Sequence, residues 1–326
     1  MNSLKPYSFV GIAAAMHLLV DGICLCTLYI MASSFRMNNI LAVFLTYNII
    51  AFMSQPFTGI LVDKYKKIHW ILISAIAFLI FAVVGCIILT NSQSIQGKVI
   101  PLIIALLLGI GNSLFHVWGG KQIVLKTGND MRTLGVFVST GAFGLAVSLV
   151  FYSWSLLYLY LIILCLLAYL YISADDGNNV KSKIDNHEVS NDNKYSTSLV
   201  LASILAVAAF VMFRSFIGET FSSDIHKNNF LIIILGAVAM FGKMSGGWIA
   251  RKIGIAKTLF FDILIVAICY LLKADGLLPV LAGIYVINTT MPITLYLANH
   301  VLKGKEGLAF GILAAALIPG FLFAML

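Results

Sequence analysis

The sequence has few charged residues for its length. Only 10% of its 326 residues are Asp, Glu, Lys or Arg, whereas 61% are hydrophobic. Soluble domains contain about 25% charged and about 45–50% apolar residues, so a soluble globular fold is excluded. Apolar segments of about 20 residues, enough to cross a hydrocarbon core of about 30 Å as helices, recur along the whole chain. The composition therefore predicts an all-α integral membrane protein.

Cysteine is also scarce, and several functional motifs are absent. No Walker-type phosphate loop occurs, which makes direct use of ATP unexpected, and no HExxH motif or nucleophile elbow points to a membrane enzyme. From the missing motifs and from the cysteine positions given next, we expect no cofactor, no metal, and cysteines that serve only in packing. The five cysteines fall within apolar segments and lack the spacing of a disulfide framework or a zinc site: Cys24, Cys26, Cys86, Cys165 and Cys269.

The apolar segments number eleven. The first begins almost directly after Met1 and contains His17 and Asp21, which the apolar core of a signal peptide would lack. We therefore expect this segment to be retained. The predicted spans are residues 6–33, 38–62, 69–90, 98–119, 132–152, 154–174, 198–218, 228–249, 256–273, 276–298 and 306–326.

The net charge of +8 is distributed unevenly between the loops. If the N-terminus is cytoplasmic, fifteen basic residues fall on the inner side and four on the outer side. This bias follows the positive-inside rule, so it predicts a multi-pass protein of the cytoplasmic membrane and needs no nucleic-acid partner. The inner residues are Lys5, Lys64, Lys66, Lys67, Lys121, Lys126, Arg132, Lys181, Lys183, Lys194, Arg251, Lys252, Lys257, Lys303 and Lys305; the outer ones are Arg36, Lys98, Lys227 and Lys273.

A polar segment divides the chain. Residues 175–197, which begin "DDGNNVKSK", are rich in Asn, Asp and Lys and offer little to bury. We expect them to form a cytoplasmic linker. Six spans precede the linker in residues 1–174, and five follow it in residues 198–326, so the chain is predicted to form two helical bundles.

The two bundles share a short motif. "GILVDKYKK" (Gly59–Lys67) follows the second span, and "GGWIARKIG" follows the eighth, which is the second span of the second bundle. Aligning Gly59 with Gly247 places Asp63 opposite Arg251. Two copies at matching positions indicate an internal duplication of the kind found in many secondary transporters.

The first copy resembles the loop 2–3 signature of the major facilitator superfamily, Gly-x-Leu-x-Asp-Arg/Lys-aromatic-Gly-Arg/Lys-Arg/Lys, and departs from it at Lys66, where the family has glycine. The resemblance implies twelve spans in two bundles, so the chain, which reaches Leu326 in or just after an eleventh span, is expected to lack the last one. An acid at a helix end can accept hydrogen bonds from a neighbouring helix terminus and from cations, which would latch the bundles together; the alternative is that these charges only set the orientation in the membrane. The gating residues that the resemblance implies are Gly59, Asp63, Lys64, Lys67, Gly247 and Arg251.

Ionisable residues within the spans are few, and each must face protein, water or a substrate, because a charge at the bilayer centre costs about 2.5–3.5 kcal/mol. His17 and Asp21 are four residues apart on one helix face, and Asn112 and His116 repeat that spacing in the fourth span. The first and fourth helices line the central cavity in the superfamily. His17 with Asp21 is therefore the candidate proton site, and a satisfied structural pair is the alternative.

The second bundle offers further candidates. Arg214 would attract an anionic substrate, and the alternatives are a role in an outer gate or a pairing with nearby Glu219. Tyr285 and Asn288 share a face of the tenth span and suit either a small polar solute or hydrogen bonds between helices. We expect Lys243 and Asp262 to form a structural ion pair.

These features favour a secondary transporter that moves a small molecule by alternating access, driven by protons or another ion. The Phe115-His116 pair in "GIGNSLFHVWGGK" is distantly similar to the fosmidomycin-resistance-like branch of the superfamily, which implies efflux of a drug or metabolite. The alternatives are a non-transporting relative acting as a receptor or remnant and, less favoured, a polytopic membrane enzyme. The expected partners are the substrate, the coupling ion and the lipid bilayer, and the chain is expected to be a monomer.

Overall fold

The computed structural model describes residues 6–34, 40–65, 68–91, 99–174, 196–223 and 228–325. In these residues the regular structure is helical, which confirms the predicted fold class. Ten helical segments have the length and composition needed to cross a membrane, and α11, with 17 residues, is an eleventh apolar helix. The elements are α1 (Pro6–Ser34), α2 (Ile40–Asn48), η1 (Ile49–Met53), α3 (Gln55–Lys64), α4 (Ile68–Asn91), α5 (Val99–Thr127), α6 (Met131–Phe151), α7 (Trp154–Ala174), α9 (Thr197–Ser222), α10 (Asn229–Ile253), α11 (Ile255–Leu271), η2 (Lys273–Asp275), α12 (Leu277–Val301), α13 (Glu306–Ala315) and α14 (Leu317–Met325).

Two of the spans are interrupted, which the hydropathy pattern does not indicate. The second span passes through a π-helical turn, η1, between α2 and α3. Ser54 Oγ and Gln55 Nε2 donate to the carbonyls of Ile50 and Ala51, at 2.5 and 2.8 Å, so side chains satisfy backbone groups within this distorted turn. The last span breaks between α13 and α14, where Pro319 lacks the N–H that a continuous helix would need.

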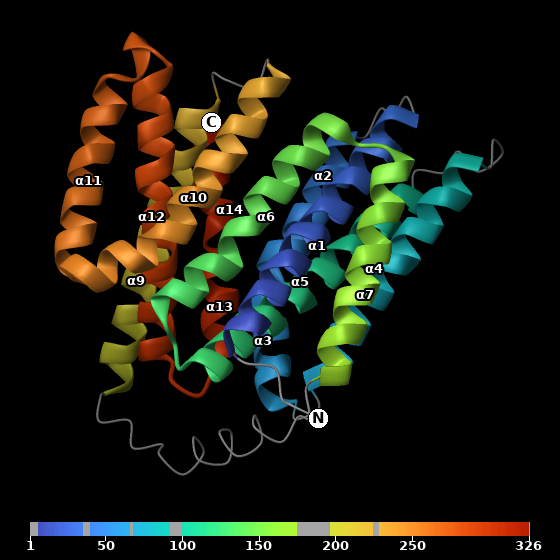
Figure 1. Cartoon of the computed structure of the whole chain (residues 1–326), viewed down its shortest axis with the longest axis horizontal. Helices are drawn as coiled ribbons and strands as arrows, with labels where there is room; N and C mark the ends of the chain where they lie inside the picture. Colours follow the sequence, from blue (N-terminus) through green and yellow to red (C-terminus); the bar gives the residue numbers. More distant parts are fainter. Residues whose placement is uncertain are drawn as a thin grey trace.

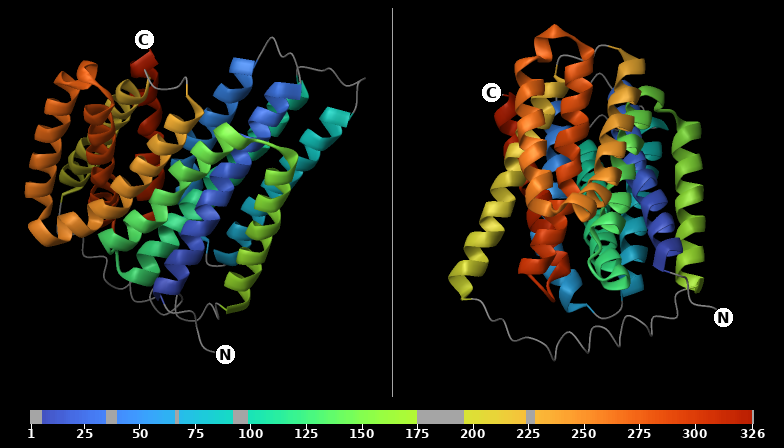
Figure 2. Two further views of the ribbon diagram at one scale, coloured as in Figure 1. Left: turned by 45° about the horizontal axis from the view of Figure 1, so that its top comes forward. Right: turned by 60° about the vertical axis from the view of Figure 1, so that its left-hand side comes forward.

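The helices form two groups (Figure 1). Helices α1 to α7 lie on one side of the molecule and α9 to α14 on the other, and Figure 2 shows the same separation from two further directions. The groups meet where α6 packs along α10 and where α3 packs on α13. The N- and C-terminal ends of the chain lie at opposite ends of the helices in Figure 1, as an odd number of crossings requires.

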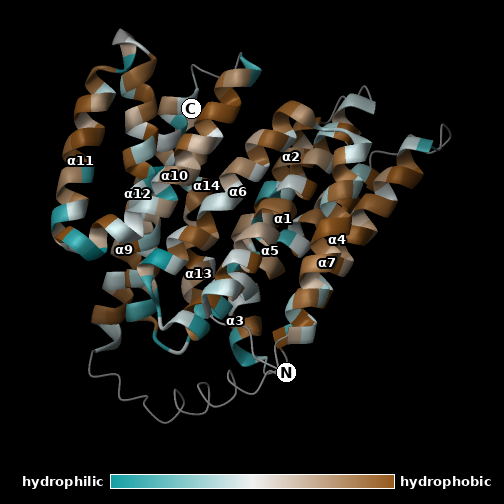
Figure 3. Ribbon diagram, viewed as in Figure 1, coloured by the Kyte–Doolittle hydropathy of each residue, from teal (hydrophilic) through white to brown (hydrophobic). Residues whose placement is uncertain are grey.

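Apolar side chains cover the outside of the helices as well as the core (Figure 3). Large residues such as Trp70, Phe81, Leu166 and Leu264 are exposed because their neighbours in the membrane are lipid chains rather than water. Hydrophilic residues are concentrated near the helix ends in Figure 3. The buried polar residues therefore stand out against an otherwise apolar molecule, and their positions define the candidate site.

Two sequence expectations concern residues outside the described ranges. The linker predicted at 175–197 lies there except for its last two residues, where Ser196 caps α9 by accepting from the backbone N–H of Leu199. Helix α9 begins at Thr197, one residue before the start predicted for this span at 198. Lys67 of the predicted gate also lies outside the described residues.

Candidate functional site

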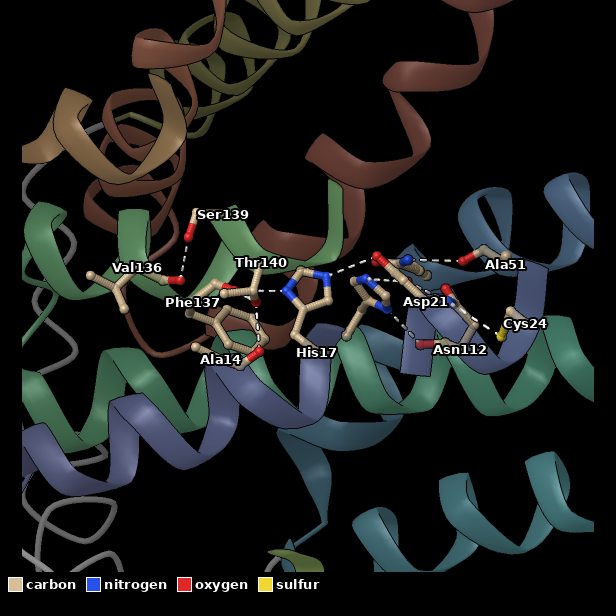
Figure 4. A network of polar contacts seen from close by, with 12 residues as sticks. Ala14, His17, Asp21, Cys24, Ala51, Asn112, Val136, Phe137, Ser139 and Thr140 are labelled. Carbon is tan, nitrogen blue, oxygen red and sulfur yellow. Dashed lines mark hydrogen bonds and ion pairs between the residues drawn. The ribbon is translucent and has the colours of Figure 1, made fainter. Parts of the chain in front are cut away.

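The four polar residues predicted for the first and fourth spans form one buried cluster. His17 and Asp21 lie one turn apart on α1, and Asn112 and His116 lie one turn apart on the facing helix α5. All four are at least nine-tenths buried. Figure 4 shows Asp21 between His17 and Asn112, with Cys24 one turn further along α1.

Asp21 is the centre of this cluster. Its Oδ2 lies 3.3 Å from Nε2 of His17, and its Oδ1 lies 3.5 Å from Nε2 of His116. Asn112 Nδ2 donates to the same Oδ1 at 3.0 Å, while its own Oδ1 has no hydrogen-bond partner. The sequence predicted two separate i, i+4 pairs, whereas the structure joins them on one carboxylate.

Backbone carbonyls orient both imidazole rings. His17 Nδ1 lies 2.7 Å from the carbonyl oxygen of Phe137, and His116 Nδ1 lies 2.9 Å from that of Asn112. A carbonyl oxygen only accepts, so each Nδ1 carries hydrogen and each Nε2 faces Asp21. If both rings are neutral, each Nε2 directs a lone pair at the negatively charged carboxylate of Asp21, and these groups repel one another. A proton or another cation bound between them would remove this repulsion. Their donor atoms, with that of Asp21, lie within 4.8 Å of one another, close enough to hold a small cation.

The second group of helices carries two basic residues within its spans, Arg214 and Lys243. Arg214 on α9 is buried, and its Nη1 donates to Thr294 Oγ1 on α12 at 3.3 Å. Lys243 on α10 lies within electrostatic range of Arg214 and of Asp21. One of these two basic residues, Lys243, therefore interacts electrostatically with the Asp21 carboxylate of the other half.

The predicted ion pair between Lys243 and Asp262 is wrong. Asp262 accepts a hydrogen bond from Thr289 Oγ1 at 2.6 Å, and no ion pair joins it to Lys243 in the described residues. The two residues lie in consecutive spans, but this does not determine which face of its helix each side chain occupies. Asp262 faces α12, whereas Lys243 lies near Asp21.

Tyr285 and Asn288 are occupied by contacts within the second group. The hydroxyls of Tyr285 and Ser245 lie 2.7 Å apart, which joins α12 to α10. Asn288 Nδ2 donates to the carbonyl of Ile284 in its own helix at 2.8 Å. Contacts between and within helices, the second of the two roles considered, account for these bonds; a role in binding a solute stays a prediction.

Asp63 makes the contacts expected of an acid at a helix end. Its Oδ1 and Oδ2 accept from the backbone N–H groups of Gly307 and Leu308, each at 2.9 Å, at the start of α13. Gly59 packs so closely on α13 that a Cβ there would collide with the backbone of Gly307. Lys64, the next residue after Asp63, is exposed.

Lys121 completes this contact, which the sequence pattern did not predict. Its Nζ lies 3.3 Å from Asp63 Oδ1 and donates to the carbonyl of Val62 at 3.0 Å. Lys121 was placed in a cytoplasmic segment, but α5 continues to Thr127, so this lysine is inside the helix and buried. The apolar run from Ile123 to Leu125, which begins two residues after Lys121, is the signal that predicts the longer helix.

The second motif copy makes the equivalent contact with the charges exchanged. Gly247 packs against the backbone of Met131 and Arg132 at the start of α6, as Gly59 packs at the start of α13. Arg251 occupies the place of the acid, and its Nη1 lies 3.5 Å from Asp130, the N-cap of α6. The acid is therefore supplied by the partner helix, a complementarity that only the three-dimensional pairing reveals.

A family model described as "Major Facilitator Superfamily" matches residues 10–325, almost the whole chain. The chain belongs to the major facilitator superfamily. It is accordingly a multi-pass membrane protein and a secondary transporter, not an enzyme. Transporters of this superfamily handle small molecules, often with ion coupling.

Solved structures agree with the superfamily fold. The crystal structure of a variant of the E. coli fucose:proton symporter FucP matches with a TM-score of 0.64 and 13% sequence identity, covering 98% of this chain and 91% of that chain. At this identity the likeness shows the fold alone. No curated protein sequence matches the chain. The similarity to the fosmidomycin-resistance-like branch stays a prediction.

Proposed function

We propose that this superfamily member is a proton-coupled transporter of the cytoplasmic membrane, with its N-terminus in the cytoplasm and the Asp21 cluster as its proton site. The observation that carries the proposal is the convergence of Nε2 of His17 and Nε2 of His116 on one buried carboxylate. Each added proton converts a lone pair facing Asp21 into a donor. Proton binding therefore changes the charge at the point where the two halves face each other.

The surroundings of Asp21 contain few other titratable groups. Besides the two histidines, these are Cys24 on α1, Tyr47 on α2 and Lys243 on α10. Helix α6 carries only Arg132, in its first turn, and α7 carries no charged residue. Lys243, a cation from the opposite half, therefore opposes protonation of the histidines and is itself attracted by the Asp21 carboxylate.

The two motif copies support an alternating-access cycle. Asp63 bonds the start of α13, and Arg251 pairs with the N-cap of α6, so each half holds a helix start of the other at the same end of the molecule. By the positive-inside rule this end is cytoplasmic. In the proposal, the halves at 1–174 and 198–326 rock about the midplane, and these contacts break when the cytoplasmic side opens.

Flux measurements test the proton coupling. Purified protein is reconstituted in liposomes that contain a pH-sensitive dye, and the liposomes are challenged with sugars, amino acids, amines and organic acids. We expect solute-dependent proton movement that Asp21→Asn or His17→Gln abolishes, while Lys257→Gln, a change at an exposed helix start, retains it. Wild-type proton movement in both cluster variants would reject the assignment, and flux driven by Na⁺ with no proton movement would replace the proton with another ion.

A further inference from the structure

Arg214 and Lys243 have no acidic partner among the described residues. Arg214 is 7% exposed, and within the described residues its one hydrogen bond goes to the hydroxyl of Thr294. Lys243 makes no hydrogen bond or ion pair in the described part of the chain. No carboxylate of the described residues lies within 4.0 Å of either cation. Two positive groups near each other in a bilayer repel, and this arrangement is costly unless an anion joins them.

Two acids of the spans, Asp21 and Asp262, make their direct contacts with groups other than Arg214 and Lys243. Asp21 accepts from Asn112 and is faced by two histidines. Asp262 accepts from Thr289, away from Lys243. The positive pair is therefore not half of a structural ion pair.

The geometry around Arg214 leaves most of its donors available. The Thr294 hydroxyl donates to the carbonyl of Met291 at 2.9 Å and accepts from Arg214 Nη1, so it fixes the guanidinium through one of five N–H donors. A guanidinium binds the two oxygens of a carboxylate or phosphoryl group in a forked geometry, and a lysine adds a compact point charge.

We propose that the transported solute is a small anion bearing a carboxylate or phosphoryl group, bound by Arg214 and Lys243 opposite the Asp21 cluster. This inference rests on the proposed transport function and names its substrate class. Protons added to His17 or His116 place further positive charge near the anion, so the proton and the anion strengthen each other's binding. Such reciprocity corresponds to symport, in which both move together, whereas an antiporter requires them to compete.

Ligand-induced stabilisation tests the anion site without any transport assay. The melting temperature of the purified protein is measured with acetate, lactate, succinate, inorganic phosphate and methylphosphonate, and with the neutral analogues acetamide, lactamide and glycerol. A solute that binds only the folded protein raises the melting temperature. We expect at least one anion, and none of the neutral analogues, to do so, with a larger effect at pH 5.5 than at pH 8 (nominal test values on either side of about 6.5, the usual pKa of histidine).

Variants separate the site from a general charge effect. Arg214→Gln and Lys243→Gln should each weaken binding of that anion at least about tenfold, because a hydrogen bond to a charged group is lost. Lys257→Gln removes the same charge at an exposed position and should leave the affinity unchanged. Without ligand, Arg214→Gln should melt no lower than the wild type, since it removes an uncompensated charge; a clear loss of stability would show a structural role and overturn the inference.

The outcomes distinguish this inference from proton coupling. Stabilisation by neutral analogues alone, by no anion, or equally in all variants would overturn the anion site. Proton movement in liposomes that only neutral solutes drive would also overturn the anion site, but it would be consistent with the proposed proton site at Asp21. Anion binding that Arg214→Gln abolishes, in a protein that moves no protons, would retain the anion site and reject the coupling.

Discussion

Replacement of Asp63 by asparagine tests whether this residue holds the cytoplasmic side closed. Two contacts from its carboxylate cross between the halves, to the N–H groups of Gly307 and Leu308. The ion pair with Lys121 joins residues of the same half, so it persists when the halves separate. Of the contacts that Asp63 makes, only the two crossing bonds therefore bias the equilibrium between the closed and open states.

The size of the effect follows from these bonds. A hydrogen bond to a charged group contributes about 1.5–3 kcal/mol and a neutral one about 0.5–1.5 kcal/mol. Asparagine retains one acceptor oxygen, so Asp63→Asn loses one bond and weakens the other. The loss of about 2–4 kcal/mol lowers the ratio of closed to open protein by about 30- to 700-fold.

Distances between spin labels report this equilibrium. Labels at Trp70→Cys and Lys257→Cys, in a background without the exposed Cys165, lie in opposite halves directly after the two motif copies. We expect Asp63→Asn to add a population with a longer distance, and Lys64→Gln, an exposed neighbour, to leave the distribution unchanged. Identical distributions for wild type and Asp63→Asn would refute the reasoning.

Two further predictions concern the same end of the molecule. Gly59→Ala should lower the free energy of unfolding by about 1–3 kcal/mol through collision with α13, whereas Gly11→Ala, with no atom near the added Cβ, should not; equal denaturation midpoints would contradict this. Burial raises the pKa of Asp130, but hydrogen bonds from Arg132 outweigh it and hold that pKa below its usual range. Its stabilising effect should be present above about pH 3.9 and be lost on further acidification. Melting curves from pH 6 to pH 3 (nominal limits bracketing the usual pKa of about 3.9) should therefore show a smaller acid-induced decrease for Asp130→Asn than for the wild type.

Hydropathy and short-range spacing predicted much of the fold. Backbone polar groups have no water to bond in a bilayer, so each long apolar segment must be a helix, and its position follows from composition. The i, i+4 spacing also predicted that His17 shares a helix face with Asp21, and Asn112 with His116, because residues four apart lie about one helical turn apart. The interruption at η1 was not predictable from hydropathy, because the turn leaves the apolar run unbroken.

The candidate site was predicted only in part. The sequence identified the residues that bear charge within the membrane, since each is conspicuous in an apolar segment. It paired Lys243 with Asp262, which was wrong, and it placed Lys121 outside the helix that buries it. Both errors concern helix rotation and helix length, which depend on packing against neighbours rather than on hydropathy.

Sequence alone determined that this protein crosses the membrane repeatedly, that it carries a duplicated motif, and which polar residues the bilayer surrounds. Tertiary structure decided which of them meet. Asn112 reaches Asp21 across 91 positions of the chain, and Gly307 reaches Asp63 across 244. Such contacts depend on the orientation of packed helices about their axes, and the lipid, being equally apolar on every side, imposes no orientation. The small residues and hydrogen bonds at the helix contacts impose it instead.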